Sequence, residues 1–275
     1  MRALPFPMIA ALMKGVALAL LAACTSSSEL SMGSDSSVQR ELRVVTSGGF
    51  TAAYNVLAPA FERETGVRLV TEYGASSGGA PDSIPVRLAR GEKFDVIILS
   101  QSSLNALTDE GYVQADSRRD LVRSSIGMAV RDGAVAPDIS SPERFRQVLL
   151  DATSIGYSAS ASGTYLSTDL FPRLGLWDRI SAKATRVVSE RVATVVARGD
   201  VQIGFQQISE ILPIAGAQYV GPIPDEYQKV TTFSAGVTAT AENPSDAERL
   251  IRFVSSADVA DTIAATGLEP VVDEQ

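Results

Sequence analysis

The chain has 275 residues, which is enough for one large or two modest domains. Its formal net charge of −8 at pH 7 argues against a nucleic-acid-binding surface and against a polybasic membrane patch. The sequence contains no His and one Cys, so Ser–His and Cys–His nucleophile pairs and most transition-metal sites are excluded. We therefore expect no enzyme, no catalytic residues, no metal, no cofactor and no nucleic-acid partner.

Residues 1–23 have the composition of a signal peptide. Arg2 and Lys14 are their only charged residues, and the apolar run at 16–21 is too short to span a membrane permanently. Lys14 interrupts the apolar stretch, so a start at Met13 would give a tidier signal. Export out of the cytoplasm is the prediction in either case.

Small residues directly before Cys24 resemble the lipobox of bacterial lipoproteins, in which the thiol is lipidated and becomes the mature N-terminus. The alternative is ordinary signal-peptide cleavage, with Cys24 incidental. Residues 24–40 are polar and rich in Ser, which predicts a tether without a core. We expect a periplasmic protein that is anchored to the membrane through lipidated Cys24.

Strands and helices alternate in the first part of the body. Residues 42–46 are apolar and β-branched, typical of a strand, and Leu57 and Phe61 fall on one face of a helix that Gly66 ends. The same patterns predict strands at 67–73 and 94–99, and helices at 51–64, 81–90 and from Ser100 to Gly111. This order favours a parallel, doubly wound sheet.

The second part of the body repeats the alternation. The patterns predict strands at 154–158, 186–188 and 201–205, and helices at 165–174, 189–197 and 245–265. We interpret Trp177 as a packing residue of this part rather than as a stacking platform for a ligand.

Two segments, 124–130 and 230–240, do not fit the alternation. Both are extended and rich in β-branched residues, and we interpret them as strands that pass between two lobes. The first lobe would then be discontinuous, with residues 41–123 and 233–275, and the second would hold residues 124–232. The predicted fold class is α/β with two lobes, each a parallel-type sheet flanked by helices, joined by a two-strand hinge.

Four strand-to-helix turns are unusually small and polar. They are TSGG at 46–49, GASSGG at 74–79, SASASG at 158–163 and SE at 189–190. Any one of them could be an ordinary turn or helix N-cap, which use the same residues. In open parallel sheets, however, ligands bind where strands run into helix N-termini, and free N–H groups there suit anions. Together the four turns predict a shared cleft for a small anion.

Arg87 follows the second turn and is open to two interpretations. It could hold a carboxylate in bidentate fashion, or it could serve the structure of its own lobe.

Six motifs occur between about Leu42 and Val271, in the order FERETGVRL, YGASSG, GEKFDVIILS, LGLWD, RGDVQIGFQ and TGLEPV. Together they resemble the molybdate-binding-protein family of bacterial ABC-importer receptors. The resemblance implies a two-lobed periplasmic binding protein with a two-strand hinge. Such a protein closes over an oxyanion and delivers it to a permease in the inner membrane, and we expect it to be a monomer.

The resemblance also implies which residues bind the ligand. The family's first-loop Ser falls on Gly49, with Ser47 as the nearest hydroxyl, and its Tyr falls on Gln207. Together with the polar turns, the expected ligand-binding residues are Ser47, Gly48, Gly49, Ser76, Ser77, Ser160, Ser162, Ser189, Glu190 and Gln207, with Arg87 as the charged candidate.

The sequence departs from the family pattern at Gly49 and Gln207, and it has extra residues between GASS and Arg87. These departures predict a larger pocket of different shape. We therefore favour a small organic polycarboxylate over molybdate or tungstate as the ligand.

Two alternatives come from other functional classes. A sensor that feeds a membrane signalling protein would share the fold but not the partner. A serine-dependent hydrolase is disfavoured, because the sequence lacks His and a G-x-S-x-G elbow.

Overall fold

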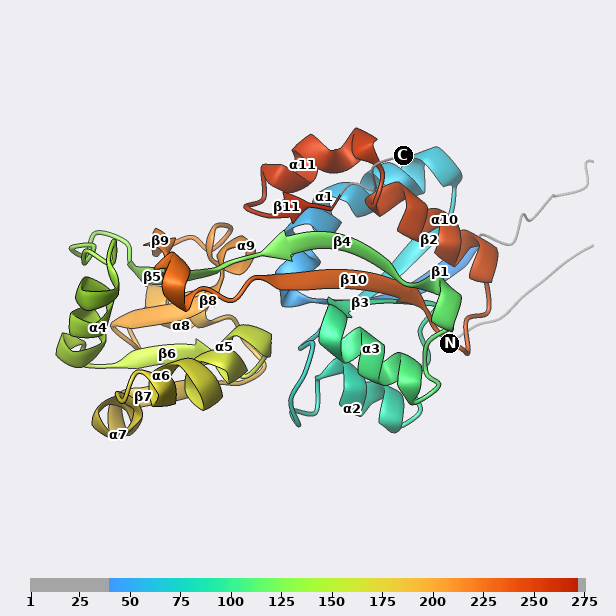
Figure 1. Cartoon of the computed structure of the whole chain (residues 1–275). Helices are drawn as coiled ribbons and strands as arrows, with labels where there is room; N and C mark the ends of the chain where they lie inside the picture. The colour runs from blue at the N-terminus through green and yellow to red at the C-terminus, as the bar shows by residue number, and fades with distance from the viewer. Residues whose placement is uncertain (1–39, 272–275) are drawn as a thin grey trace, which may run out of the picture. The chain divides into compact units, whose positions relative to one another are not determined.

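The computed structural model describes residues 40–271, so the expected signal peptide, Cys24 and nearly all of the expected tether lie outside the described residues. Within this range the chain forms two lobes, each built around one mixed β-sheet with helices on its faces (Figure 1). This confirms the predicted α/β, two-lobed fold class, but each sheet contains antiparallel strands beside the parallel ones, unlike the parallel sheet that the strand–helix alternation favoured.

The first lobe contains a six-stranded sheet. Its order is β11 (Glu269–Pro270), β4 (Arg119–Ser124), β10 (Thr231–Val237), β3 (Val96–Ser100), β1 (Glu41–Ser47) and β2 (Arg68–Gly74). β1 pairs in parallel with both β2 and β3, whereas β10 is antiparallel to β3 and β4. The accompanying helices are α1 (Gly48–Thr65), α2 (Ile84–Ala89), α3 (Gln101–Asp109), α10 (Pro244–Val254) and α11 (Ala260–Ala264).

The second lobe contains a five-stranded sheet. Its order is β7 (Ala184–Val187), β6 (Ile155–Ser158), β8 (Ile203–Gln207), β5 (Ile126–Arg131) and β9 (Ala217–Pro222). β6 is parallel to β7 and β8, and β5 is antiparallel to β8 and β9. The helices are α4 (Pro142–Asp151), α5 (Ala161–Tyr165), a π-helical turn at Leu166–Leu170, α6 (Phe171–Arg173), α7 (Trp177–Ile180), α8 (Val192–Arg198) and α9 (Ile208–Ile211).

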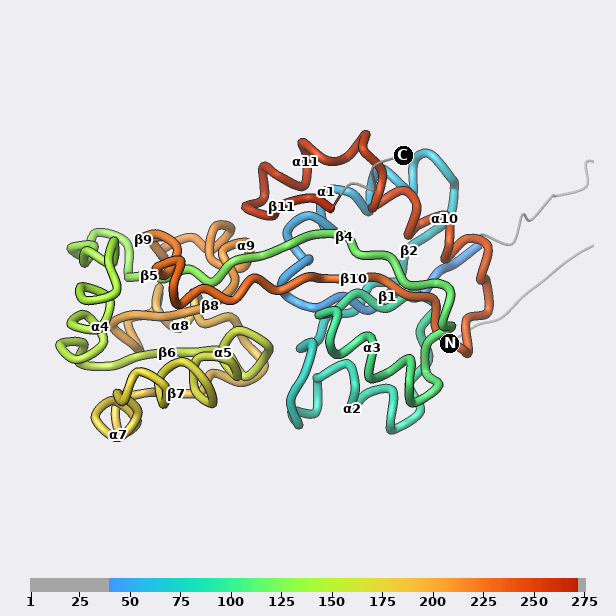
Figure 2. Tube along the Cα trace, viewed as in Figure 1, coloured from blue at the N-terminus to red at the C-terminus, as the bar shows by residue number. Residues whose placement is uncertain are grey.

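The lobes are joined where two strands cross between them. β4 continues into β5 through Ser125, and the chain returns from β9 to β10. β4 and β10 pair antiparallel and run side by side out of the first sheet (Figure 2). The two-strand hinge is therefore present, whereas the residue boundaries of the lobes stay a prediction.

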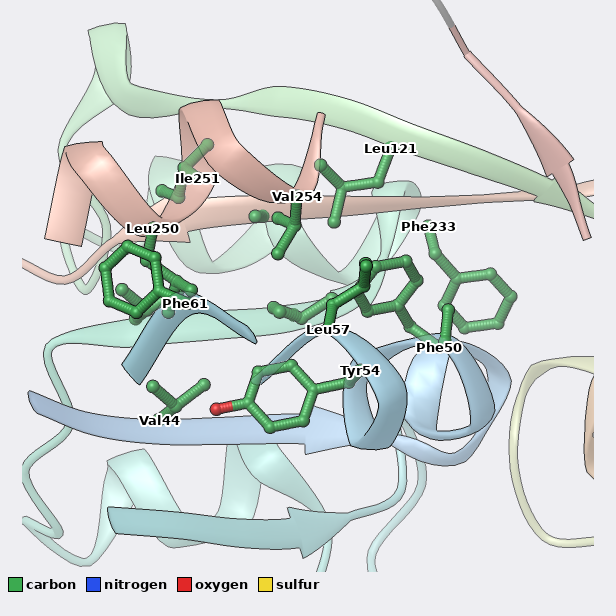
Figure 3. Close-up of a cluster of buried hydrophobic side chains, with 14 of the residues drawn as sticks. Val44, Phe50, Tyr54, Leu57, Phe61, Leu121, Phe233, Leu250, Ile251 and Val254 are labelled. Carbon is green, nitrogen blue, oxygen red and sulfur yellow. The ribbon is translucent and has the colours of Figure 1, made fainter. Parts of the chain in front are cut away.

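The core of the first lobe explains why α1 forms where it does. Phe50, Tyr54, Leu57 and Phe61 recur at helical spacing and are all buried in one cluster, which also includes Leu250 of α10 (Figure 3). Burial of each such side chain contributes about 1.5–3 kcal/mol. Gly66 ends the helix with a φ of 70°, as its predicted capping role requires.

The second lobe has its own aromatic core. Trp177 stacks against Phe171 with ring centroids 6.4 Å apart and meets Tyr157 edge-on at 6.3 Å. Its contacts therefore agree with the interpretation of Trp177 as a packing residue.

Several predicted elements have different boundaries in the structure. Gly48 and Gly49 form the first turn of α1 rather than a loop, because Ser47 already has the extended backbone of an N-cap. α5 likewise begins at Ala161, so part of the third polar turn is helical. The long helix predicted at 245–265 is interrupted between α10 and α11, and α4, α9 and β9 had no prediction. The four residues of α9 are too few to show the periodicity that identifies longer helices, whereas α4 has ten residues and was overlooked.

Across residues 40–271, every helix falls short of the length and apolar character needed to span a membrane.

Candidate functional site

A cavity of about 300 Å³, which we name the cleft, is lined by residues of both lobes. All four polar turns contribute to its wall. They supply Gly48 and Gly49, Gly74 to Ser76, Ser158 to Ser162, and Ser189 to Arg191. The remaining lining residues are Thr51, Tyr73, Asp82, Val187, Gln206, Gln207, Glu210 and Phe233. The carboxyl-end turns of both sheets therefore meet at one place, as the topology predicts.

The first lobe presents the N-terminal turn of α1 to the cleft. Amide groups in the first turn of a helix have no partner within the helix, so they are available to an anion. Gly49 is required at this place, because a β-carbon there would come within 2.1 Å of the Phe233 ring. Gly occupies this turn because the neighbouring side chains leave no room for a β-carbon.

The hydroxyl groups of the first lobe have different surroundings. Ser76 lines the cleft and is buried, and its Oγ accepts a hydrogen bond from the backbone N–H of Ser100 at 3.0 Å. Ser47 is 1% exposed, and its Oγ has no hydrogen-bond partner among the described residues, but it is not part of the cleft wall.

The second lobe presents the turn after β6. The hydroxyls of Ser158 and Ser162 lie 3.1 Å apart, and Ser158 Oγ accepts the N–H of Gly163 at 3.2 Å. A β-carbon on Gly163 would come within 1.7 Å of the Ser158 carbonyl oxygen, so only Gly fits there. Ser160 also lines the cleft. This turn is therefore held in one conformation with its hydroxyls at the wall.

Ser189 and Glu190 line the cleft but are engaged with other residues. Ser189 has a φ of 60°, and its Oγ donates to Asp82 Oδ1 of the first lobe at 2.8 Å. Two hydrogen bonds from Arg198, at 2.7 and 3.2 Å, hold the pKa of Glu190 below its ordinary value. The negative charge of Glu190 is therefore compensated, and Ser189 connects the two lobes. A second connection is the 2.8 Å hydrogen bond from Ser209 Oγ to the Gly49 carbonyl.

Gln207 lies at the end of β8 and borders both the cleft and the hinge. With its amide oriented to satisfy its neighbours, Nε2 donates to Ser124 Oγ at 2.8 Å and Oε1 accepts from Thr231 Oγ1 at 3.2 Å. Its side chain therefore connects the two crossing segments of the chain.

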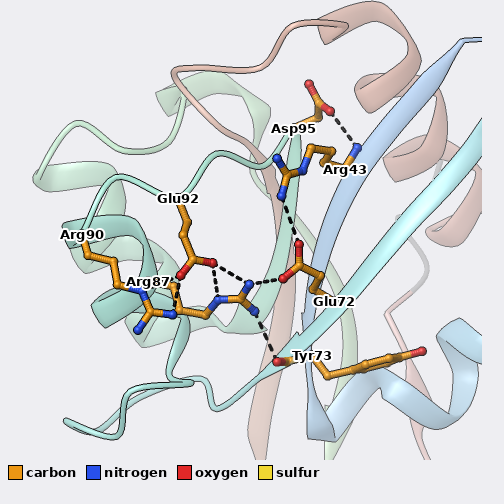
Figure 4. A network of polar contacts seen from close by, with 7 residues as sticks. All are labelled: Arg43, Glu72, Tyr73, Arg87, Arg90, Glu92 and Asp95. Atoms are coloured by element: carbon orange, nitrogen blue, oxygen red, sulfur yellow. Dashed lines mark hydrogen bonds and ion pairs between the residues drawn. The ribbon is translucent and has the colours of Figure 1, made fainter.

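Arg87 does not line the cleft. Its guanidinium is buried in the first lobe, where it pairs with Glu72 and with Glu92 (Figure 4). Hydrogen bonding from Arg87 holds the pKa of both carboxyls below their ordinary values. The structural interpretation of Arg87 accounts for all of these contacts, and the ligand-binding interpretation accounts for none.

Ser77 is also absent from the cleft wall. It lines a second cavity of about 410 Å³, together with residues from the start of α3 and with Lys229.

Three charged residues of the cleft were missed from the sequence: Asp82, Arg191 and Glu210. Arg191 lines the cleft, and within residues 40–271 it forms no ion pair. A cation at the start of a helix opposes the helix dipole, which is a signal that could have identified it. Glu210 lies in the short helix α9, which follows Gln206 and Gln207 at the end of β8. The local sequence pattern did not predict that helix.

Glu210 is the carboxyl with the most altered acidity in the cleft. Burial raises its pKa from 4.5 to about 7, and the charge of Arg191 and a hydrogen bond from Gln206 Nε2 at 3.0 Å oppose this rise only in part. At neutral pH the group can therefore either accept or donate a proton. Among the described residues no group of His, Cys, Asp and Glu side chains is arranged to hold a metal ion.

The arrangement suits a small anion. Neutral N–H and O–H donors come from both lobes, and Arg191 supplies a positive charge. Glu210 adds a proton-exchanging group beside them.

Comparisons with known proteins agree with this architecture. The profile of the family described as "Bacterial extracellular solute-binding protein" matches residues 42–269. An aconitate isomerase from a Pseudomonas species is 45% identical over 230 residues, which are 84% of this chain and 88% of that protein. The molybdate-binding protein ModA of Escherichia coli (strain K12) is 21% identical over 208 residues, 74% of this chain and 79% of that protein.

Among solved structures, the periplasmic molybdate-binding protein of Azotobacter vinelandii is similar with a TM-score of 0.68 and 20% identity. The match covers 85% of this chain and 100% of that chain. At this identity the likeness concerns the fold, and it confirms the resemblance inferred from the sequence motifs.

Proposed function

Since the chain belongs to the bacterial extracellular solute-binding protein family, we propose that its cleft binds a small organic polycarboxylate. The observation that carries this proposal is the 45% identity to a protein named for aconitate, a tricarboxylate. The wall of the cleft supports it, because Arg191 can pair with one carboxylate while N–H and O–H donors of both lobes bind others.

Molybdate or tungstate is the alternative ligand. Its support comes from relatives that are 20–21% identical, which is a likeness of fold more than of site. Gly49 and Gln207 stand where the family pattern has Ser and Tyr. The side chain of Gln207 is hydrogen-bonded to the two crossing segments of the hinge. These differences favour the organic ligand.

Isothermal titration calorimetry with cis-aconitate, trans-aconitate, citrate, molybdate and sulfate tests the ligand class. We expect one or more of the tricarboxylates to bind at micromolar concentration and the inorganic anions to bind at least 100-fold more weakly. Micromolar molybdate binding without any carboxylate response would overturn the proposal.

The proposed setting is a periplasmic, monomeric receptor that is anchored through lipidated Cys24 and delivers its ligand to an ABC-transporter permease. Closure of the two lobes over the ligand would create the surface that the permease recognises. A Cys24→Ser variant should be released from membranes, and its continued membrane association would contradict the anchor.

The sensor alternative has the same ligand and a different membrane partner, so uptake of labelled ligand by cells separates the sensor from the transport receptor.

Isomerisation of aconitate is a second candidate function. The absence of His excludes several kinds of catalytic site, but it leaves carboxyl groups able to move protons. The aconitate-isomerase relative favours this candidate. Incubation of the purified protein with cis-aconitate, followed by proton NMR, separates a receptor, which returns the ligand unchanged, from an isomerase, which produces trans-aconitate.

A further inference from the structure

Glu210 lies where the two lobes meet at the cleft. It belongs to α9 of the second lobe, and its Oε1 accepts a hydrogen bond from Gln206 Nε2 at 3.0 Å. A β-carbon on Gly48, in the first turn of α1, would come within 1.9 Å of the same oxygen. The carboxyl therefore reaches the wall formed by the other lobe, and it lines the cavity that the ligand would occupy.

Resting on the proposed function, we propose that Glu210 carries the proton that moves when bound aconitate isomerises. Glu210 is thereby assigned the proton transfer of the second candidate function, the isomerisation of aconitate.

The reaction balances without a second substrate. Aconitate has a methylene group next to the carbon–carbon double bond. The C–H bond of this methylene breaks, the proton goes to the Glu210 carboxylate, and the electron pair forms a new double bond to the central carbon. The electrons of the old double bond move to the former vinylic carbon, which takes the proton back from Glu210. The double bond has shifted by one carbon, and its new geometry can be cis or trans.

One carboxyl can serve both carbon atoms, because they are separated by a single carbon and can face the same side of the cleft. Burial raises the pKa of Glu210 to about 7, so the ionised and protonated forms that the two half-steps require are both populated near neutral pH. Arg191 and the amide groups at the start of α1 can stabilise the negative charge that spreads onto the substrate carboxylates.

The other acidic groups of the cleft wall have side-chain partners of their own. Glu190 is paired with Arg198, and Asp82 accepts the Ser189 hydroxyl. Tyr73 donates its hydroxyl to Asn55 Oδ1 at 2.8 Å. Glu210 accepts its side-chain hydrogen bond from the neutral amide of Gln206 through Oε1, and its other carboxyl oxygen has no side-chain hydrogen bond among the described residues, so it can exchange a proton with a ligand.

The test uses the mature protein, cis-aconitate and D₂O, with proton NMR to follow both trans-aconitate and deuterium at its new methylene carbon, the former vinylic carbon. The wild type should form trans-aconitate and exchange. Glu210→Gln should lose both by at least about 100-fold, as expected for removal of a general base. Its affinity for cis-aconitate by calorimetry should stay within about 3-fold, because the Gln amide keeps the shape of the wall. Glu226→Gln, an exposed Glu in the same lobe, is the matched control and should react like the wild type.

Each result decides between the proposals. A Glu210→Gln protein that isomerises at the wild-type rate overturns the assignment. A wild type that binds aconitate but neither isomerises nor exchanges it also overturns the assignment, and leaves the binding proposal intact. A wild type that does not bind aconitate overturns the proposed function itself.

If Glu210→Gln is unfolded by circular dichroism, Glu210→Asp serves instead. That variant should bind normally with a rate at least 10-fold reduced, and an unchanged rate would contradict the assignment.

Discussion

The carboxyl of Glu210 in one lobe occupies the space that a side chain at Gly48 in the other lobe would need. The separation between Oε1 and a β-carbon at position 48 would be 1.9 Å, far inside van der Waals contact. The Gly at the start of α1 therefore does more than expose amide groups, since it lets a carboxyl of the opposite lobe approach the cleft wall.

A Gly48→Ala substitution should displace this carboxyl without unfolding the protein, because the end of a Glu side chain can move. We expect a melting temperature within a few degrees of the wild type, and aconitate affinity or turnover reduced by about 10-fold or more. Gly79→Ala is the matched control, since a β-carbon there has no neighbour within 4 Å. Identical ligand behaviour in both variants would contradict the importance of this contact.

Arg191→Gln should weaken binding of a polycarboxylate by about 10- to 100-fold, the loss expected for one charge-assisted interaction of roughly 1.5–3 kcal/mol. Calorimetry measures this loss, and the melting temperature should stay within a few degrees of the wild type, because the charge of Arg191 acts on Glu210 without a close ion pair among residues 40–271. Arg179→Gln, an exposed Arg in the same lobe, should bind like the wild type. Equal affinities for the two variants would remove Arg191 from the site.

Ser162→Ala and Ser77→Ala should differ, because Ser162 lines the cleft and Ser77 lines the second cavity. Loss of one hydroxyl donor costs about 0.5–1.5 kcal/mol, so Ser162→Ala should reduce affinity roughly 2- to 10-fold. Ser77→Ala should leave affinity unchanged. The reverse pattern, measured by the same titrations, would place the ligand in the second cavity.

Arg87→Gln should lower the free energy of unfolding and leave the ligand affinity unchanged. The substitution removes the cation that pairs with Glu72 and Glu92, so we expect a loss of about 1–3 kcal/mol in the free energy of unfolding. Urea denaturation measures this loss. A stable variant that no longer binds ligand would instead indicate that Arg87 contributes to the ligand site.

Stability should depend on pH through Glu210. Its folded-state pKa of about 7 lies above the ordinary 4.5, so the folded protein holds this proton more tightly than the unfolded chain. The resulting stability is fully present below pH 4.5 and is lost as the pH rises through 7, by at most about 3 kcal/mol. Between pH 5 and pH 8, Glu210→Gln should therefore gain stability relative to the wild type in urea denaturation. Glu226→Gln should show no such gain, and a parallel pH response of wild type and Glu210→Gln would contradict the raised pKa.

Much of the fold could be predicted because its signals are local. The apolar run ending in β3, the face of α1 that includes Leu57 and Phe61, and the cap at Gly66 are each contained within one or two dozen residues. The four-residue helix α9 and the strand β9 escaped prediction, because packing against the rest of the lobe determines them more than their own periodicity does. The ten-residue helix α4 had a local signal in its N-cap Ser141 followed by Pro142, and this signal was overlooked.

The sequence by itself determined the polar turns and the edge of the sheets at which they lie, since strand order and turn composition are properties of neighbouring residues. Only the tertiary structure decided which charged groups face the cleft. Arg87 turns to Glu72 in its own lobe, Arg191 remains at the cleft wall, and Glu210 lies against Gly48 of the opposite lobe. The direction and acidity of a charged side chain depend on partners that are distant in sequence, and folding alone brings those partners together.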